Sequence, residues 1–149
     1  EALDAAGIVP VNPEGAVTLP FGGGTLTLLP GAKAEYEQSN DYSILAELQY
    51  GDTSFLFAGD AETERLKEYL AGSPRTFDVL KVPHHGRADA LSEAFFTVVA
   101  PKYAVITCSE KNMPEESVVS FLKSLGAQVH GTALGDVILT SDGKAVKVA

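Results

Sequence analysis

The chain has 149 residues, 45% of them apolar and 21% charged, which is the balance of a single globular domain with a hydrophobic core. Its net charge of −9 and its scattered basic residues argue against tight non-specific binding to nucleic acid, although metal ions could still supply positive charge locally. No stretch approaches the roughly 20 apolar residues of a membrane span. Cys108 is the only cysteine, which excludes an internal disulfide and a cysteine-based zinc site.

The N-terminal part is predicted to be mostly β-structure. Residues 1–6 have the pattern of a helix end closed by Gly7, and the lack of an N-cap before them suggests a segment of a longer protein. Two short strands, 17–19 and 25–29, flank a run of glycines at 22–24. Because no lysine follows these glycines and no helix begins there, they predict a hairpin turn rather than a phosphate-binding loop.

A second hairpin is predicted from strands at 43–50 and 54–58, joined by the turn signal at 51–52. Alternation in the first of these strands places three apolar side chains on one face: Ile44, Ala46 and Leu48. An amphipathic helix is predicted over residues 62–71, ended by Gly72.

The C-terminal part alternates between strands and helices. The strands are predicted at 77–82, 103–107 and 127–130, and the helices at 91–99 and 114–125. A closing hairpin is predicted from 137–140 and 145–148. The chain is therefore predicted to be an α/β protein, with a mixed sheet covered by helices on one face.

Asp60 directly follows the predicted strand 54–58 and the small residue Gly59. A carboxylate at this position stands on a rigid support, and the glycine lets a ligand approach closely. The same position also suits a helix N-cap, with Glu62 as a favourable charge in the first turn. The local sequence alone favours the cap, and the two roles are compatible.

Two of the three histidines, His84 and His85, stand together at the exit of strand 77–82, between Pro83 and Gly86. Imidazole is the commonest metal ligand and the usual general acid or base near neutral pH. A surface loop that happens to contain two histidines is an equally good interpretation of this motif alone. Asp60 strengthens the functional interpretation, because the ends of neighbouring parallel strands meet at one edge of a sheet.

Four other residues carry weaker signals. Asn40 and Asp41 precede a strand and could reach the same edge, although such residues usually form turns. Cys108 is expected to be a small buried residue, and His130 to be structural or exposed.

Several phrases of the sequence resemble the metallo-β-lactamase-like domain of ComEC-type DNA-uptake competence proteins and its free-standing relatives. They are NDYSIL at 40–45, YGDTSFLFAGDAE at 50–62 and DVLKVPHHG at 78–86. Residues 100–106 and 140–144 continue the pattern nearly to the C-terminus.

The resemblance implies an αββα sandwich, of which residues 1–149 would form the C-terminal half as one partial domain. It implies two divalent ions, zinc or manganese, with Asp60 bridging them and with His84 and His85 in the same site. The implied reaction is metal-dependent hydrolysis of phosphodiesters, nucleic acid among them, by the complete protein; this segment alone is expected to be inactive. The resemblance also implies a location outside the cytoplasmic membrane.

The sequence departs from the family pattern in three ways. The main ligand motif, His-x-His-x-Asp-His, belongs upstream of residue 1, so the expected partner is the N-terminal half of the same domain, or a second copy of the chain. Met113 stands where relatives often carry a histidine and cannot bind a hard hydrolytic metal in its place. Arg87 replaces a serine and is, with Asn40, an expected substrate-binding residue.

Two alternatives remain open from the sequence. One is a degenerate member of the same fold that has lost its metals and serves as a binding or structural module, an alternative that Met113 favours. The other is an unrelated doubly wound domain in which Asp60 is only a helix cap.

Overall fold

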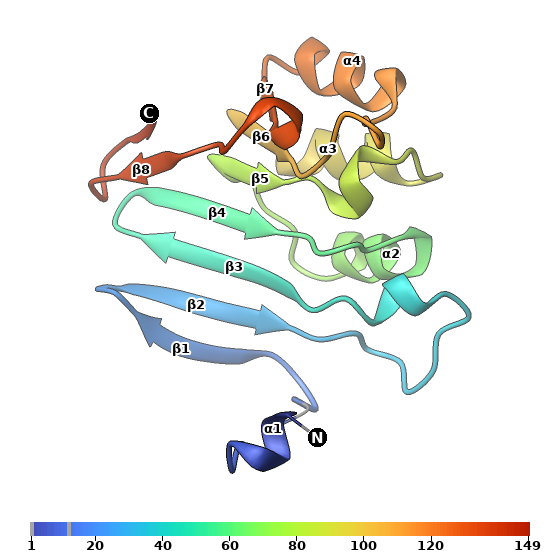
Figure 1. The fold of residues 1–149 in the computed structure, drawn as a ribbon, viewed down its shortest axis with the longest axis vertical. Helices are drawn as coiled ribbons and strands as arrows, with labels where there is room; N and C mark the ends of the chain where they lie inside the picture. Colours follow the sequence, from blue (N-terminus) through green and yellow to red (C-terminus); the bar gives the residue numbers. More distant parts are fainter. Residues whose placement is uncertain (1, 12) are drawn as a thin grey trace.

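The computed structural model describes residues 2–11 and 13–149. Seven strands form one mixed sheet in the order β1-β2-β3-β4-β5-β6-β7 (Figure 1). Their bounds are β1 Val17–Phe21, β2 Gly24–Leu29, β3 Leu45–Tyr50, β4 Thr53–Phe57, β5 Val79–Lys81, β6 Tyr103–Ile106 and β7 Gln128–Gly131. Neighbours from β1 to β4 pair antiparallel, whereas β4 to β7 pair parallel. The sheet therefore changes from a meander to crossover connections at β4.

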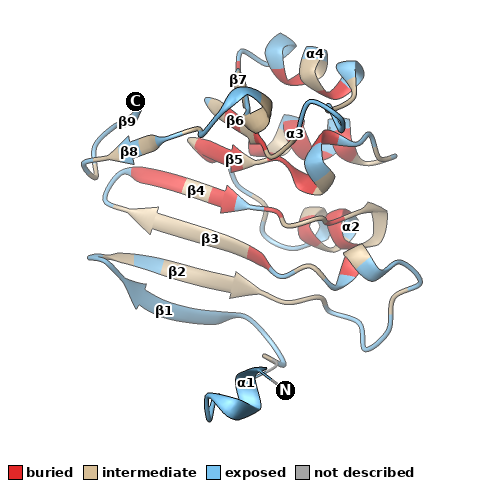
Figure 2. Cartoon of the chain, viewed as in Figure 1, coloured by how far each residue is buried: buried red, intermediate tan, exposed pale blue. Residues whose placement is uncertain are grey.

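The main helices cover one face of this sheet. They are α2 (Thr63–Ala71), α3 (Ser92–Val99) and α4 (Glu116–Ser124), while α1 (Ala2–Ala5) is a short N-terminal turn. In Figure 1 the helices α2 and α3 lie behind the sheet, and Figure 2 shows that their inner sides are buried. Their core side chains include Leu66, Phe95, Phe96 and Leu122, which cluster with Leu45, Leu56, Leu80 and Ala104 of the strands. The predicted mixed α/β sheet with helices on one face is confirmed.

Glycines with positive φ form the turns of the two predicted hairpins in the N-terminal part. Gly22 and Gly23 have φ of 55° and 83°, and they join Phe21 to its partner Gly24. Positive φ at both central residues is the geometry of the tight turn that matches the twist of antiparallel strands. Gly51, with φ 56°, lies in the turn that joins β3 to β4. The glycine run is therefore a hairpin turn, as the sequence predicted.

The face of the sheet opposite the helices is rich in apolar side chains. The register places Leu26, Leu48 and Phe55 in one row across this face, and Leu28, Ala46 and Phe57 in the next. Leu19, which pairs with Leu26 and so extends the first row, and Phe57, at the end of the second row, are each 44% exposed. The predicted alternation in β3 is thus real, but it faces away from the helices, and the buried residue of β3 is its neighbour Leu45.

The closing hairpin, β8 (Leu139–Ser141) and β9 (Val146–Val148), forms a separate two-stranded sheet, as predicted. It contacts the β3–β4 turn, where the Asp52 amide donates to the Gly143 carbonyl at 2.6 Å. The Tyr103 hydroxyl of β6 donates to the Val146 carbonyl at 3.4 Å. The hairpin therefore lies over one end of the sheet and leaves the rest of the apolar face open.

Some predicted boundaries were wrong. The helix predicted at 114–125 begins only at Glu116, and the strand predicted at 77–82 is reduced to Val79–Lys81. The predicted first helix is the short turn α1, and its residue Glu1 lies outside the described part of the chain. Across residues 2–11 and 13–149, no helix is both long enough and apolar enough to cross a membrane.

Candidate functional site

Asp60 and the histidine pair lie at the carboxyl ends of two neighbouring parallel strands. Asp60 comes three residues after the end of β4, and His84 and His85 follow β5, within the short 3-10 turn Pro83–Gly86. His85 Nε2 stands 3.4 Å from Asp60 Oδ1. The structure thus brings Asp60 and His85 together at one edge of the sheet.

The backbone after β5 is held in an unusual conformation. His84 and His85 have φ of 46° and 54°, in the left-handed region that side chains other than glycine seldom adopt. Such strain persists only where surrounding contacts enforce it, and it is common at functional sites. Here the His84 amide donates to the Gly59 carbonyl at 3.3 Å, and the Glu115 amide donates to the Gly86 carbonyl at 2.9 Å. The histidines are therefore fixed to the β4 turn on one side and to the start of α4 on the other.

Asp60 has a cation and a hydroxyl beside it. Its amide donates to Ser43 Oγ at 3.0 Å. Lys81 Nζ donates to the Gly59 carbonyl at 2.6 Å and lies 3.4 Å from Asp60 Oδ1. Lys81 pairs with Phe57 in the register, so its side chain leaves from the open face of the sheet. The Asp60 carboxylate is therefore reached from the face that carries no helix.

The other side of the His85 ring faces Thr107. His85 Nδ1 lies 2.8 Å from the Thr107 carbonyl oxygen, which can only accept a hydrogen bond. A proton on Nδ1 satisfies this contact, and Nε2 then faces Asp60 either protonated or with a free electron pair. A backbone carbonyl that receives one ring N–H is also the usual way in which proteins orient a metal-binding histidine.

His84 belongs to a second polar cluster beside the first. Its Nδ1 lies 3.2 Å from Glu62 Oε1, and Asn40 Nδ2 donates to the same oxygen at 3.0 Å. The same amide nitrogen stands 3.4 Å from His84 Nε2. The sequence identified Asn40 and His84 but treated Glu62 only as a helix-end charge. Its position two residues after Asp60, at the same strand exit, was the available signal.

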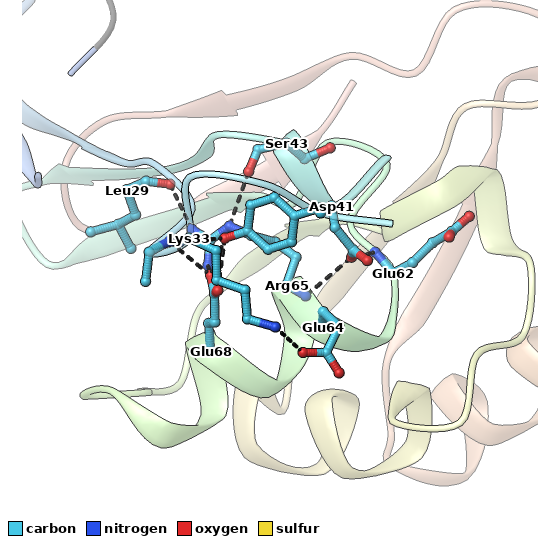
Figure 3. A network of polar contacts seen from close by, with 10 residues as sticks. Leu29, Lys33, Asp41, Ser43, Glu62, Glu64, Arg65 and Glu68 are labelled. Carbon is cyan, nitrogen blue, oxygen red and sulfur yellow. Dashed lines mark hydrogen bonds and ion pairs between the residues drawn. The ribbon is translucent and has the colours of Figure 1, made fainter. Parts of the chain in front are cut away.

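The interpretation of Asp60 as a helix cap was wrong. The residue that precedes α2 is Glu62, and its side chain makes no capping hydrogen bond. The cap comes instead from outside the helix, because Asp41 Oδ1 accepts from the amides of Glu62 and Arg65, both at 3.1 Å (Figure 3). Asp41 is buried and structural, which leaves the Asp60 carboxylate available for a ligand.

A hollow of about 460 Å³ opens beside His85. Its lining includes both histidines, Arg87, Cys108, Ser109 and Asn112. Cys108 is partly exposed here, so the expectation of a buried cysteine was wrong. Met113 is 56% exposed and does not line the hollow. His130 lies elsewhere, partly buried against the Tyr103 ring, and its Nε2 has no hydrogen-bond partner within the described part of the chain.

The described residues supply ligand pairs but no larger set. In residues 2–11 and 13–149, no group of three or more His, Cys, Asp and Glu side chains is arranged to hold a metal ion. The two pairs are Asp60 with His85, and Glu62 with His84. A protein zinc site ordinarily has three or four protein ligands. A complete site would need ligands beyond these pairs.

The sequence has a recognisable relative. No known family model matches the chain. Over 88 residues, 56% of the chain, it is 32% identical to ComE operon protein 3 of Bacillus subtilis (strain 168). The match takes in 11% of that protein, so the chain spans about a tenth of the curated relative's length.

Proposed function

We propose that this chain is the C-terminal half of a metallo-β-lactamase-like domain and that the complete domain hydrolyses phosphodiesters with divalent metal ions. Three observations support the proposal: the similarity to ComE operon protein 3, the meeting of Asp60 and His85 at one sheet edge, and the open apolar face beside them. A link to DNA uptake follows from the ComEC-type resemblance and makes nucleic acid the first substrate to test.

The Asp60–His85 distance is the observation that carries the metal part of the proposal. Two ligands, each about 2.1 Å from a zinc ion in a tetrahedral site, are separated by about 3.4 Å. Asp60 Oδ1 and His85 Nε2 stand at 3.4 Å. The Thr107 carbonyl already occupies Nδ1 of the same ring, so the electron pair of Nε2 can point at an ion.

The side chains at this sheet edge would either hold the metal ions or position the residues that do. A bound zinc or manganese pair supplies a hydroxide nucleophile near neutral pH and stabilises the charge that develops on the phosphoryl group. Asp60 and His85 would hold the ions, and Thr107 fixes the ring of His85. Lys81 holds the Gly59 carbonyl and thereby the turn that carries Asp60. Glu62 and Asn40 orient His84 at the border of the same site.

The missing ligands would come from the N-terminal half of the domain, packed on the open face. Lys81 and the Asp60 carboxylate that it contacts are approached from this face. A sheet laid over the apolar rows of β2, β3 and β4 would therefore bring its own strand ends to the Asp60 side. Residues 1–149 alone would remain inactive.

A metal-free member of the same fold is the second candidate. The observation that favours it is the Lys81 ammonium 3.4 Å from Asp60, because a fixed cation already neutralises part of the carboxylate's charge. In such a protein the domain would bind a partner or a nucleotide without hydrolysing it.

Metal analysis of the complete protein tests the proposal. We expect about two zinc or manganese ions per chain and metal-dependent cleavage of a model phosphodiester. Asp60→Asn should abolish both, whereas Asp52→Asn, an exposed position in the β3–β4 turn, should change neither. A complete protein that binds no divalent ion would refute hydrolysis by this site and support the metal-free alternative.

A further inference from the structure

The hollow beside His85 is the site of a further inference. The chain carries 20 Asp and Glu residues, yet none of those in residues 2–11 and 13–149 lines this hollow. Its charged and titratable members are Arg87, His84, His85 and the Cys108 thiol. A second hollow, beside the start of α2, is by contrast lined by five acidic residues: Glu35, Glu37, Asp41, Glu62 and Glu64. The distribution of charge therefore favours an anion at the His85 hollow rather than at the acidic one.

Most polar groups of the hollow are already committed to the protein. Thr132 Oγ1 accepts from the Cys108 amide and donates to the Cys108 carbonyl, both at 2.9 Å. Ser109 and Asn112 close a tight loop through two backbone hydrogen bonds, at 3.0 and 3.3 Å. Thr107 is occupied by His85. These contacts hold the walls in place before any ligand arrives.

Two side chains with nitrogen donors remain uncommitted. The Arg87 guanidinium has no acidic partner, and the Asn112 carboxamide has no hydrogen-bond partner, among the described residues. The backbone of Arg87 is nevertheless fixed, because its amide donates to the His84 carbonyl at 2.9 Å. A guanidinium presents paired N–H groups whose spacing matches two oxygens of a phosphate.

We propose that this hollow binds the phosphoryl group of a nucleotide-sized ligand, with Arg87 as its main anion contact and Asn112 as a second donor. The inference rests on the proposed function for the identity of the ligand, and it names the place where one substrate phosphate sits. The volume of about 460 Å³ lies in the range of pockets that hold small organic ligands. His85 is shared between the hollow and Asp60, so a phosphate bound at Arg87 lies next to the reacting centre.

Binding without metal is the test, because it separates this site from the hydrolytic proposal. The 149-residue chain, kept in a chelator, is titrated by calorimetry with inorganic phosphate and with a deoxynucleoside 5′-monophosphate. We expect both to bind and the nucleotide to bind at least about threefold more tightly, since the hollow also accepts its sugar and base. Equal affinities would overturn the assignment to a nucleotide.

The variants locate the contact. Arg87→Gln should weaken binding of both ligands about tenfold or more, and Asn112→Ala about threefold, because hydrogen bonds to a charged group are the stronger ones. Arg87→Lys should give an intermediate loss, since it keeps the charge but not the paired donors. Lys111→Gln is the matched control. It removes a cation next to Asn112 that does not line the hollow, and it should change the phosphate affinity less than about twofold.

The stability and the phosphate affinity of the variants together decide the proposal. The three positions, 87, 111 and 112, are all exposed, so the urea midpoints of the four variants should match the parent and exclude misfolding. Phosphate affinity that is unchanged in Arg87→Gln, or reduced equally in Lys111→Gln, would overturn the proposal. So would the absence of binding at millimolar phosphate. If the complete protein shows no metal-dependent activity but the 149-residue chain still binds phosphate through Arg87, the proposed function is refuted and the phosphate site remains supported.

Discussion

At the scale of single residues, the Arg65 side chain of α2 connects separate parts of the fold. It is buried, and it joins three parts of the chain (Figure 3). Its Nε donates to the Ser43 carbonyl at 3.0 Å, its Nη2 to the Leu29 carbonyl at 2.6 Å, and its Nη1 lies 3.3 Å from Glu68 Oε2. Burial lowers the pKa of Arg65, and the Glu68 carboxylate opposes that effect. The guanidinium thus holds the ends of β2 and β3 against the helix.

Replacement of Arg65 should destabilise the fold strongly. Arg65→Met leaves two backbone carbonyls and Glu68 without their donor, so we expect the free energy of unfolding to fall by about 3–5 kcal/mol. Asp41→Ala, which removes the cap of α2, should cost about 1–2 kcal/mol. Urea unfolding followed by circular dichroism measures both. Lys67→Met, on the exposed side of the same helix, is the control and should change the midpoint little.

Asp78 should make the stability depend on pH in acid. Burial alone would raise its pKa, but the Lys102 ammonium at 2.7 Å and the Ser54 amide and hydroxyl hold the pKa of Asp78 below its ordinary 3.8. A carboxyl with a lowered folded pKa stabilises the fold fully above its unfolded pKa, and this contribution is lost as the pH falls through the folded pKa.

The corresponding measurement compares the parent with Asp78→Asn by urea unfolding between about pH 7 and about pH 2. The parent should be the more stable at neutral pH, and the difference should shrink below about pH 4. Asp136→Asn, at an exposed position, is the control and should leave the profile unchanged. A difference between Asp78→Asn and the parent that is constant across the range would contradict the assigned role of the Asp78–Lys102 pair.

At the scale of elements, local patterns determined most of what could be predicted. The hairpin turns at 22–23 and 51–52 were predictable because glycine and positive φ leave few alternatives. The start of α2 was not, since its cap is supplied by Asp41, more than 20 residues away. Which face of β3 meets the helices was also beyond the local pattern, because both faces carry apolar residues.

The residues of the candidate site likewise fall into some that the sequence could identify and others that it could not. Asp60 and His85 could be identified because each follows an apolar strand, and parallel pairing of β4 and β5 brings those strand ends together. The contacts of Glu62 and Lys81 and the hollow beside Arg87 depend on side-chain directions that only the folded strand ends of β4 and β5 define. Sequence spacing gave no sign of those directions.

The turn that carries the histidines should be intolerant of any side chain at Gly86. A Cβ there would lie 2.7 Å from Pro114 Cβ and 3.2 Å from Ile106 Cγ2, and φ is +76°. Gly86→Ala therefore combines a clash with a strained backbone, and we expect a loss of about 2–4 kcal/mol in unfolding free energy. Gly126→Ala separates the two causes, because φ is +88° and nothing lies within 4 Å of the added atom. That control should cost about 1 kcal/mol; an equal loss in both variants would contradict the packing explanation.

At the scale of the whole molecule, the site is only part of what a metal centre requires. The described residues offer the pairs Asp60–His85 and Glu62–His84, and two ions need more ligands than either pair contains. We therefore expect a zinc titration of the isolated 149-residue chain to show at most one weak site. Asp60→Asn should weaken it further, while Asp52→Asn should not. Tight binding of two ions by the isolated chain would show that the centre is complete without another segment.

The open face of the sheet leads to the last prediction. The rows that contain Leu26, Leu48 and Phe55, and Leu28, Ala46 and Phe57, would form a large apolar surface in the isolated chain, and such surfaces rarely remain uncovered in soluble monomers. In the complete protein we expect the other half of the domain to cover them. The isolated chain should then self-associate through this face, with a sedimentation coefficient that rises with concentration.

Phe57→Lys tests whether this face is responsible. Phe57 is 44% exposed, so a lysine there can reach solvent without disturbing the core, and its charge should shift the chain towards monomer. Leu125→Lys is the matched control, because Leu125 is 38% exposed at the end of α4, on the helix side. It should leave the association unchanged. A parent chain that sediments as a monomer at all concentrations would mean that the sheet needs no second layer, and the proposal of a half-domain would fail with it.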